Sequence, residues 1–425
     1  MEKLQLATVF SGIGAIEHAL KRSFIPYDIV FASDNGDREL NIPEEDIKRK
    51  LENISSYSER KDYIDELYSN LRKTNFVEKS YLANYGIDKS RFHQDVRFID
   101  GYEYRDKVDL FVGGSPCQSF SMVGKRGGFE DTRGTLFYEF ARLVGEIQPK
   151  VFIYENVRGV LSHDQGNTWA IMQNVFDELG YTWNYSILNA KNYGIPQNRE
   201  RLFVVGFLDE AAGNNFAFPD ANPLKSIMKD YLEDNVSEKY YLGAKGIDFV
   251  TKEKNLRKQN TQINGEIAVC QKANQQFNWH GDFIFEPIDS IEGKYIDDKY
   301  FLSDKLVDYV MSPGTKDFYS RPEIDLDIAR PLLSSMHKMH RAGVDNYVTT
   351  RGCIRKLTPR ECLRLMGFCD SFEIVVSDTQ MYRQSGNSIV VDVLIHIVLN
   401  IMKSFNGEDV SETILTKNIE QLTLF

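Results

Sequence analysis

The chain has few cysteines and histidines for its length. It contains five cysteines and seven histidines among 425 residues. The cysteines form no Cys-x-x-Cys pair and share no zinc-like spacing with the histidines. This pattern argues against a disulfide framework and predicts no metal site. The expected compartment is a reducing cytoplasm.

The sequence also lacks a long hydrophobic run free of polar residues. The apolar start, Leu4–Ile16, is interrupted by two glycines and followed at once by Glu17, unlike a signal peptide. A second apolar stretch, Ile389–Met402, carries a polar residue at every fourth position. This spacing predicts a helix with one polar stripe, too short to cross a bilayer. We therefore expect no membrane association.

An overall excess of positive charge is missing too. The 51 Lys and Arg residues against 62 Asp and Glu give a net charge of −11, which argues against a uniformly basic nucleic-acid binder. The charges are nevertheless segregated. Residues 328–364 carry eight basic and two acidic side chains, whereas residues 284–327 carry five basic and eleven acidic ones. This segregation predicts a basic face beside an acidic one.

Short apolar runs alternate with helical stripes through the first half of the chain. This alternation predicts an α/β fold, while the turn-rich region that follows predicts a smaller second domain. The expected segments are 1–207 for the catalytic and cofactor-binding domain, 208–350 for the second domain, 351–403 for a closing segment and 404–425 for a tail. The expected strands are residues 4–10, 29–32, 108–112, 151–154, 181–189 and 202–207, with helices from Ala15 and over Leu136–Ile147.

One stretch combines a strand end with a nucleophilic residue. The apolar run Val108–Val112 stops at two glycines, and Pro116-Cys117 follows at the strand's carboxyl end, where open α/β sheets keep their chemistry. Glycines and cations continue to Gly134, as expected of a loop that closes over a substrate and meets phosphates. Taken alone, a single cysteine is more often a small buried residue. The other motifs decide between these interpretations.

Three further strings have the spacing of a catalytic domain. Phe10–Gly14 turns tightly into a helix, and Asp34, 22 residues after Gly12, has the position of a ribose-hydroxyl acceptor. Glu155 follows a buried strand, although a strand-end glutamate is usually only solvated. Gln197, Arg199 and Arg201 alternate, so on one strand they would share a face. The ordinary alternative for them is a charged strand edge.

Together these strings resemble the motifs of the DNA (cytosine-5) methyltransferase family, of the bacterial restriction-modification or orphan type. The resemblance implies a Rossmann-like S-adenosylmethionine-dependent methyltransferase sheet with a smaller, irregular target-recognition domain. It implies catalytic roles for Cys117, Glu155, Arg199 and Arg201. It implies cofactor contacts from Phe10, Ser11, Gly12, Gly14, Asp34, Asp95, Val96, Pro116, Asn387 and Ser388. It implies DNA contacts from Ser119, Ser121, Lys125, Arg133, Gln197 and Asn387.

The implied reaction moves a methyl group from S-adenosylmethionine to carbon 5 of cytosine in a short sequence of double-stranded DNA. In the family the target base is flipped out and a cysteine adds to its carbon 6. A cognate restriction endonuclease, acting separately, is an implied partner of the restriction-modification type. The implied location is the bacterial cytoplasm, in association with the nucleoid.

Three alternatives differ from this interpretation. A branch of the same family methylates tRNA, but the variable region of roughly 140 residues favours a groove-reading DNA module. A DNA-binding relative without activity is disfavoured by the intact Cys117, Glu155 and Arg201. A cysteine hydrolase would need a partner histidine, and no histidine stands in a comparable motif.

Two segments are not explained by the reaction. The connection Arg38–Phe92 is longer than expected for the family. Its surface helices are either a decorative insertion or a specific contact surface, and we favour decoration. The chain ends in Gln421–Phe425, whose apolar residues either fold onto the protein or bind a partner. This pentapeptide resembles the motif by which bacterial proteins bind the replicative sliding clamp.

Overall fold

A computed structural model of the chain describes residues 3–115, 136–234, 236–258, 261–273, 278–287, 314–315, 318–319 and 352–406. The chain divides into two compact units. The first comprises Met1–Leu232, Gly265–Gly281 and Pro359–Phe425, and the second comprises Glu233–Asn264 and Asp282–Thr358. The first unit thus continues 25 residues past the boundary expected at residue 207, and it takes back a segment from within the expected second domain.

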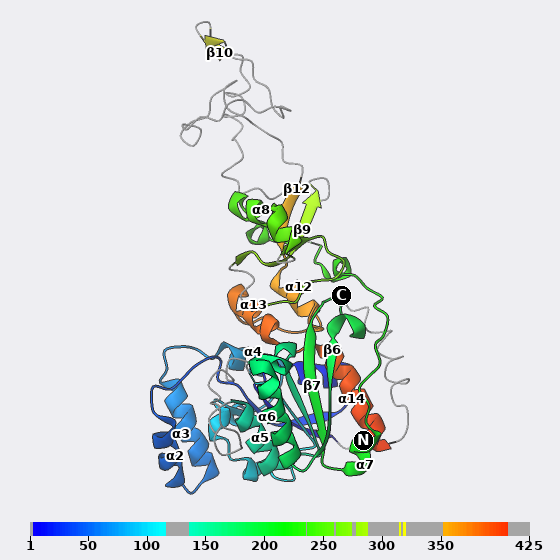
Figure 1. Ribbon diagram of the computed structural model, residues 1–425. Coiled ribbons are helices and arrows are strands. Elements are labelled where there is room, and N and C mark those ends of the chain that lie inside the picture. Colours follow the sequence, from blue (N-terminus) through cyan, green and yellow to red (C-terminus); the bar gives the residue numbers. More distant parts are fainter. Residues whose placement is uncertain are drawn as a thin grey trace. The chain divides into compact units, whose positions relative to one another are not determined.

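The first unit is built on a seven-stranded sheet of order β3-β2-β1-β4-β5-β7-β6 (Figure 1). Five neighbouring strands are parallel, whereas β7 runs antiparallel to both β5 and β6. The α/β prediction is therefore confirmed. The strands are β1 (Leu4–Val9), β2 (Tyr27–Ser33), β3 (Phe92–His93), β4 (Leu110–Gly113), β5 (Val151–Val157), β6 (Thr182–Asn189) and β7 (Glu200–Phe207).

The central strands are apolar because both faces of the sheet are covered. In β1 the adjacent residues Ala7 and Thr8 point to opposite faces, and each is at most 1% exposed. Helices α5 (Leu136–Ile147) and α6 (Asn167–Glu178) contribute Phe140 and Phe176 to the core on one face (Figure 1). The Leu136–Ile147 helix predicted from its apolar stripe is present with those bounds.

The C-terminal segment of the first unit returns to the N-terminal helix α1 (Ala15–Arg22). It forms α12 (Pro359–Arg364), α13 (Asp378–Asn387) and α14 (Val391–Asn406), and α14 packs against α1. A two-pronged ion pair joins Arg22 to Asp392, with nitrogen–oxygen distances of 2.7 and 3.0 Å. Asp392 belongs to the predicted polar stripe, which therefore serves contacts within the fold. Residues 378–405 are apolar enough to cross a membrane, but 67% of their most apolar window is buried inside the protein, as in a core helix.

The long connection between β2 and β3 forms helices with a small core of their own. These are α2 (Glu44–Glu52), α3 (Tyr57–Ser69) and α4 (Phe76–Asn84), of which α4 had no counterpart in the sequence prediction. Ile47, Ile64 and Tyr68 are each at most 4% exposed and form the centre of this core. The remaining elements of the first unit are α7 (Glu210–Asn215) and the 3-10 helices η1 (Lys89–Arg91), η2 (Val96–Phe98), η3 (Gly101–Tyr104), η5 (Arg158–Leu161), η6 (His163–Gly166), η7 (Ala190–Tyr193) and η8 (Met228–Tyr231).

The second unit contains a three-stranded sheet of order β12-β9-β8, in which β12 and β9 are antiparallel. Val250 and Phe283 are its buried apolar centre. The charge-segregated region, residues 284–364, lies mostly outside the described residues. The elements are α8 (Ala244–Thr251), α9 (Glu253–Arg257), η9 (Glu238–Tyr240), β8 (Thr261–Ile263), β9 (Gly281–Pro287), β12 (Gly352–Lys356) and the pair β10 (Gly314–Thr315) and β11 (Phe318–Tyr319).

Candidate active site

The carboxyl edge of the parallel strands brings a glutamate and an arginine together. Glu155 lies near the end of β5, and Arg201 lies at the start of the antiparallel neighbour β7, so both belong to the same edge. The Nε atom of Arg201 is 3.1 Å from Oε1 of Glu155, and the side chains are 17% and 14% exposed. Because the pair is largely shielded from water, its charges interact more strongly than a surface pair would.

Burial also changes the acidity of the glutamate. Desolvation raises the pKa of Glu155 above its ordinary value, and the guanidinium groups of Arg201 and Arg199 oppose this shift only in part. A carboxyl group with a raised pKa retains its proton closer to neutrality, as a general acid must. Burial therefore favours the protonated form of Glu155, whereas the neighbouring guanidinium groups favour its charged form.

The end of β4 lies directly against this pair. A Cβ atom at Gly114 would come within 2.9 Å of both the carbonyl oxygen and Oε2 of Glu155, so only glycine fits there. Ser115, the residue after Gly114, is held by Asn156. The Nδ2 atom of Asn156 donates to the carbonyl oxygen of Ser115 at 3.1 Å. The strand that precedes the predicted nucleophile thus ends beside the glutamate. The predicted residues Pro116, Cys117, Ser119, Ser121, Lys125 and Arg133 lie outside the described residues.

Gln197 and Arg199 do not share a strand face with Arg201, and this correction changes their interpretation. Strand β7 begins only at Glu200. Gln197 is fully buried, donating through Nε2 to the carbonyl oxygen of Leu365 and accepting at Oε1 from the backbone N–H of Gln271. With both ends of its amide bound inside the fold, Gln197 joins chain segments in this structure and offers no free group to DNA.

Arg199 joins three segments as well. Its guanidinium donates to the carbonyl oxygens of Gln271 at 2.9 Å, Gly386 at 3.0 Å and Ser388 at 2.8 Å. The side chain is 3% exposed, and burial lowers the pKa of Arg199 to about 10, so the group remains charged at neutral pH. Sequence reasoning missed the contribution of Gln271, because no local string marks a backbone carbonyl as an acceptor.

The glycine turn after β1 is braced by the end of β2. Asp34 accepts hydrogen bonds from the backbone N–H groups of Gly12 at 3.0 Å and Gly36 at 2.9 Å. Phe10 and Gly12 both have positive φ, at 52° and 53°, which sets a sharp turn. Ser11 adds a hydrogen bond from its hydroxyl to the carbonyl oxygen of Ser33 at 3.1 Å. Hydrogen bonds therefore hold the turn after β1 and Asp34 together.

Asp95, at the end of β3, is almost fully enclosed. It accepts from the backbone N–H of Arg97 and from the Arg97 guanidinium, with Nη2 at 2.6 Å, and it also accepts from the hydroxyl of Tyr68. Its neighbour Val96 is 5% exposed. Asn387 ends α13 and is exposed, whereas Ser388 is buried. The predicted cofactor residues thus lie on the ends of β1, β2, β3 and α13.

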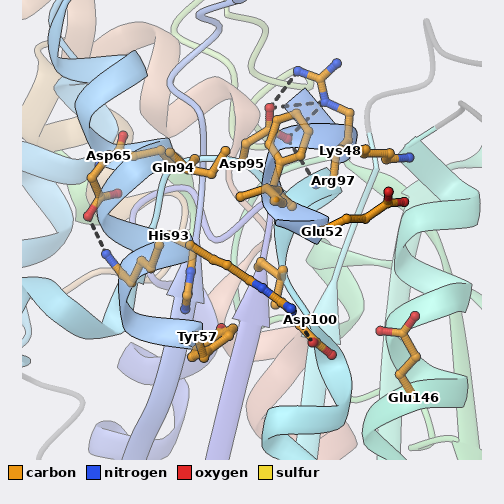
Figure 2. Close-up of a pocket in the computed structure, with 16 residues that line it drawn as sticks. Lys48, Glu52, Tyr57, Asp65, His93, Gln94, Asp95, Arg97, Asp100 and Glu146 are labelled. Carbon is orange, nitrogen blue, oxygen red and sulfur yellow. Dashed lines mark hydrogen bonds and ion pairs between the residues drawn. The ribbon is translucent and has the colours of Figure 1, made fainter. Parts of the chain in front are cut away.

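A cavity of about 450 Å³ lies beside Asp95 and away from Glu155 and Arg201. Residues of α2, α3 and the stretch that follows β3 form most of its lining (Figure 2). Asp95 and Arg97 lie next to each other at its edge, and most of its charged groups already pair with one another, as Arg60 does with Asp100 at 3.3 Å. Among the described residues, no group of three His, Cys, Asp or Glu side chains could hold a metal ion.

Comparisons with a family model and with individual known proteins identify the same family. The model of C-5 cytosine-specific DNA methylases matches residues 4–403. The chain is 35% identical to the type II methyltransferase M.HhaI of Haemophilus parahaemolyticus, over 70% of this chain and 77% of that protein. It is 34% identical to M.HpaII of Haemophilus parainfluenzae, over 75% and 78%. It is 29% identical to the orphan methyltransferase M.SPRI of Bacillus phage SPR, over 96% and 100%.

Solved structures agree on the fold. The Entamoeba histolytica methyltransferase EhMeth matches with a TM-score of 0.57 and 16% identity, over 96% of this chain and 100% of that one. The S. pombe Dnmt2 methyltransferase matches with a TM-score of 0.55 and 16% identity, over 95% and 100%. At this identity the likeness concerns the fold alone. It supports a methyltransferase-type α/β sheet.

Proposed function

Since the chain belongs to the C-5 cytosine-specific DNA methylase family and is therefore a DNA (cytosine-5)-methyltransferase, we propose that it methylates cytosine within a short specific sequence of double-stranded DNA. The observation that carries the proposal is the pair of Glu155 and Arg201 beside Gly114, at the carboxyl edge of the sheet. This edge presents a proton donor and a cation next to the strand end that leads into Pro116-Cys117.

The cofactor in this proposal is S-adenosylmethionine, which supplies an electrophilic methyl group when bound. The residues present fit it by their chemistry. At the sharp turn of Phe10 and Gly12, only the carbonyl oxygen of Phe10, 4.0 Å away, lies near the position of a Cβ at Gly12, so a ligand has room to approach the backbone there. Asp34 and Asp95 are acceptors for a ribose hydroxyl and an adenine amine. Val96, Ser388 and the exposed Asn387 would complete the site.

Covalent catalysis explains why this set of side chains is needed. Carbon 5 of cytosine is a poor nucleophile, so the Cys117 thiolate adds to carbon 6 while Glu155 donates its proton to N3, giving an enamine whose carbon 5 can accept the methyl group. Arg201 holds the oxygen at position 2. A water molecule then takes the carbon 5 proton, the thiolate departs and the N3 proton returns to the Glu155 carboxylate, which restores the ring. Arg199 acts at a distance, by positioning the start of β7.

A base paired in a duplex cannot reach this edge, so the proposal includes base flipping, at a cost of a few kcal/mol. The loop from Ser119 to Gly134 would close over the flipped base, with Ser119, Ser121, Lys125 and Arg133 as DNA contacts. The second unit is the proposed target-recognition domain. The interior hydrogen bonds of Gln197 support a structural role for that residue in place of the DNA contact expected from the sequence.

Substrate class is tested by methyl incorporation. Purified protein with tritiated S-adenosylmethionine is expected to label unmethylated bacterial genomic DNA and to leave total tRNA unlabelled. Bisulfite sequencing of the labelled DNA should then place 5-methylcytosine at a single short sequence. Labelling of tRNA alone would reject the proposal, and 5-methylcytosine scattered without sequence preference would reject the recognition role of the second unit.

The proposed partners follow from the reaction and from the tail. In a restriction-modification system, a cognate endonuclease would act separately on the same DNA. Gln421–Phe425 lies outside the described residues, and we propose that it binds the sliding clamp of the replication machinery, which would place the enzyme at newly made DNA in the nucleoid. A flexible tether of this kind raises the effective concentration of an enzyme without adding base contacts.

A synthetic peptide covering Asn418–Phe425 is expected to bind purified bacterial clamp in the micromolar range, about −8 kcal/mol. Apolar anchors on an extended segment supply most of such binding energy. Isothermal titration calorimetry measures it, and the same peptide with Leu424→Ala and Phe425→Ala is the control, which should not bind. Equal binding by both peptides, or by neither, would remove the clamp from the proposal.

A further inference from the structure

The long connection between β2 and β3 contacts the chain at the ends of β1, β2 and β3, where predicted cofactor residues lie. At the turn after β1, the hydroxyl of Tyr85 donates to the carbonyl oxygen of Gly14 at 2.6 Å. At the end of β2, Nδ2 of Asn75 donates to the carbonyl oxygen of Asp34 at 2.8 Å. At the end of β3, Tyr68 donates to Asp95. Three contacts to three separate loops are more than surface decoration requires, so the decorative role expected from the sequence does not describe this segment.

Tyr68 is the most specific of these contacts. It comes from α3, is 1% exposed and belongs to the buried centre of the connection, so packing fixes its ring. Burial raises the pKa of its hydroxyl, and the nearby charge of Asp95 raises it further, so the group stays a protonated donor. Arg38 links α3 to the segment that carries Asp95. Its guanidinium donates hydrogen bonds to the carbonyl oxygen of Tyr68 and to the side chain of Gln94, the residue before Asp95.

All acceptor positions of Asp95 are occupied. A carboxylate offers about four lone-pair sites. The backbone N–H of Arg97 and its Nε use Oδ1 at 3.0 Å each, while Nη2 of Arg97 and the Tyr68 hydroxyl use Oδ2. A ligand amine can therefore reach this carboxylate only if one present donor moves aside.

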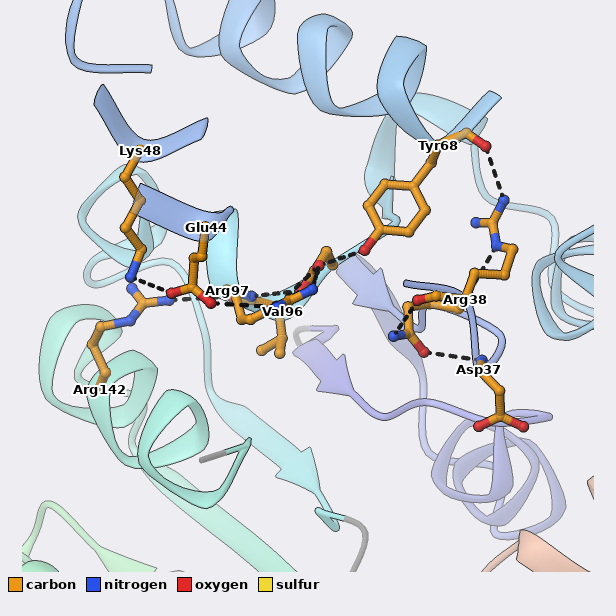
Figure 3. Close-up of polar contacts among 10 residues, drawn as sticks. Asp37, Arg38, Glu44, Lys48, Tyr68, Val96, Arg97 and Arg142 are labelled. Atoms are coloured by element: carbon orange, nitrogen blue, oxygen red, sulfur yellow. Dashed lines mark hydrogen bonds and ion pairs between the residues drawn. The ribbon is translucent and has the colours of Figure 1, made fainter. Parts of the chain in front are cut away.

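The two side-chain donors differ in how firmly they are held. The Arg97 side chain is 25% exposed, and its Nη1 already lies 3.3 Å from Glu44 of α2, which pairs in turn with Lys48 (Figure 3). If the Arg97 guanidinium moves away from Asp95, it can therefore remain paired with the carboxylate of Glu44. Tyr68 belongs to the buried cluster of the connection, and its ring extends from α3 to bring the hydroxyl to Asp95 (Figure 3). The carbonyl oxygen of Val96 is bonded by Arg142 at 3.1 Å, which holds the backbone while side chains exchange.

We propose that Tyr68 is a positioning residue of the cofactor site: it fixes the Asp95 carboxylate so that an adenine 6-amine replaces Arg97 on it, while Glu44 retains Arg97. This assigns a function in cofactor recognition to the helices α2 and α3. The inference rests on the proposed role of Asp95 as the acceptor of the adenine amine. The adenine-discriminating part of the site then includes residues from the connection as well as from the strand ends.

The test is ligand binding by calorimetry, with no turnover. S-adenosylhomocysteine is compared with S-inosylhomocysteine, in which an oxygen replaces the 6-amine. Wild-type protein is expected to bind the adenosyl compound at least about tenfold more tightly, as for one hydrogen bond to a charged group. Tyr68→Phe keeps the ring and removes only the donor. It is expected to weaken adenosyl binding by about tenfold and inosyl binding by less than about twofold, so that discrimination is largely lost.

Tyr63→Phe is the matched control, because Tyr63 lies on the same helix and packs against the same cluster. It should leave both affinities within about twofold of the wild type. If wild-type protein binds the adenosyl compound and Tyr68→Phe binds it equally well, the inference is wrong and the proposed function stands. Equal weakening of both compounds shows a merely structural role and also overturns the inference. If the wild type binds neither compound, the proposed cofactor itself is wrong.

Discussion

Replacement of Cys117 by alanine is expected to abolish methyl transfer while leaving DNA binding within about twofold of the wild type. The thiolate forms the bond to carbon 6, and no other group can take its place, whereas docking uses contacts elsewhere on the protein. A free thiol has a pKa of about 8.5, so only a few per cent is ionised at neutrality unless its surroundings help. Filter assays of methyl incorporation and gel-shift titrations with the same duplex measure the two quantities.

The addition of Cys117 to carbon 6 can be tested separately, by trapping the covalent adduct. A duplex carrying 5-fluorocytosine at the target position should give an adduct that survives denaturing electrophoresis, because fluorine cannot leave as the carbon 5 proton does. Cys117→Ala should give none. Cys369→Ala is a suitable control, since Cys369 is only partly buried and contacts the fold through its backbone N–H to His18. An adduct that persists in Cys117→Ala, or substantial residual activity, would contradict the mechanism.

Glu155→Gln is expected to slow methyl transfer by about 10² or more, the usual contribution of one general acid. Glutamine keeps the shape and can still accept from Arg201, but it has no proton to give to N3. The raised pKa of Glu155 also predicts the pH dependence. If activity depends on the protonated form of Glu155, the rate falls as the pH rises through the pKa of Glu155. The pH–rate profile of the Glu155→Gln variant should lack this decrease. Single-turnover rates across a pH series, with cofactor binding measured separately, test both points.

Glu200→Gln is the matched control for this substitution. Glu200 is the neighbour of Arg201 on β7, but its carboxylate faces outward and pairs with Arg158 at 2.6 Å, with side chains 41% and 62% exposed. Exposed pairs of this kind contribute little, so the rate should change by less than about threefold. If Glu155→Gln were no slower than this control, another group would have to protonate the base.

Several parts of the site were predictable because their signals are local. A strand that ends in glycines, a glutamate at the end of a buried strand and an acid 22 residues after a glycine turn are each readable within one string. The parallel arrangement then places these strand ends on one edge, as the observed order confirms. The pair Thr358-Pro359 is likewise a local helix-start signal, and α12 begins at Pro359.

The errors have a common physical cause. Gln197 and Arg199 alternate with Arg201 as strand residues would, yet β7 begins later and both side chains turn into the interior. Alternation predicts a shared face only where the backbone is extended and paired. The acceptors that hold Arg199 lie 72 to 189 residues away in the chain, and they are backbone carbonyls, which every residue possesses. No sequence pattern marks them.

The sequence by itself indicated which residues could perform the chemistry and which predicted strand ends carry them, because nucleophile, acid and glycine turn are properties of residue type and short spacing. Only the tertiary structure decided what holds them. The pairing of Glu155 with Arg201, the buried joint at Arg199 and the contact of Tyr68 with Asp95 depend on which distant side chains are excluded from water together. Burial raises the strength of each of these contacts, and burial is a property of the packed fold.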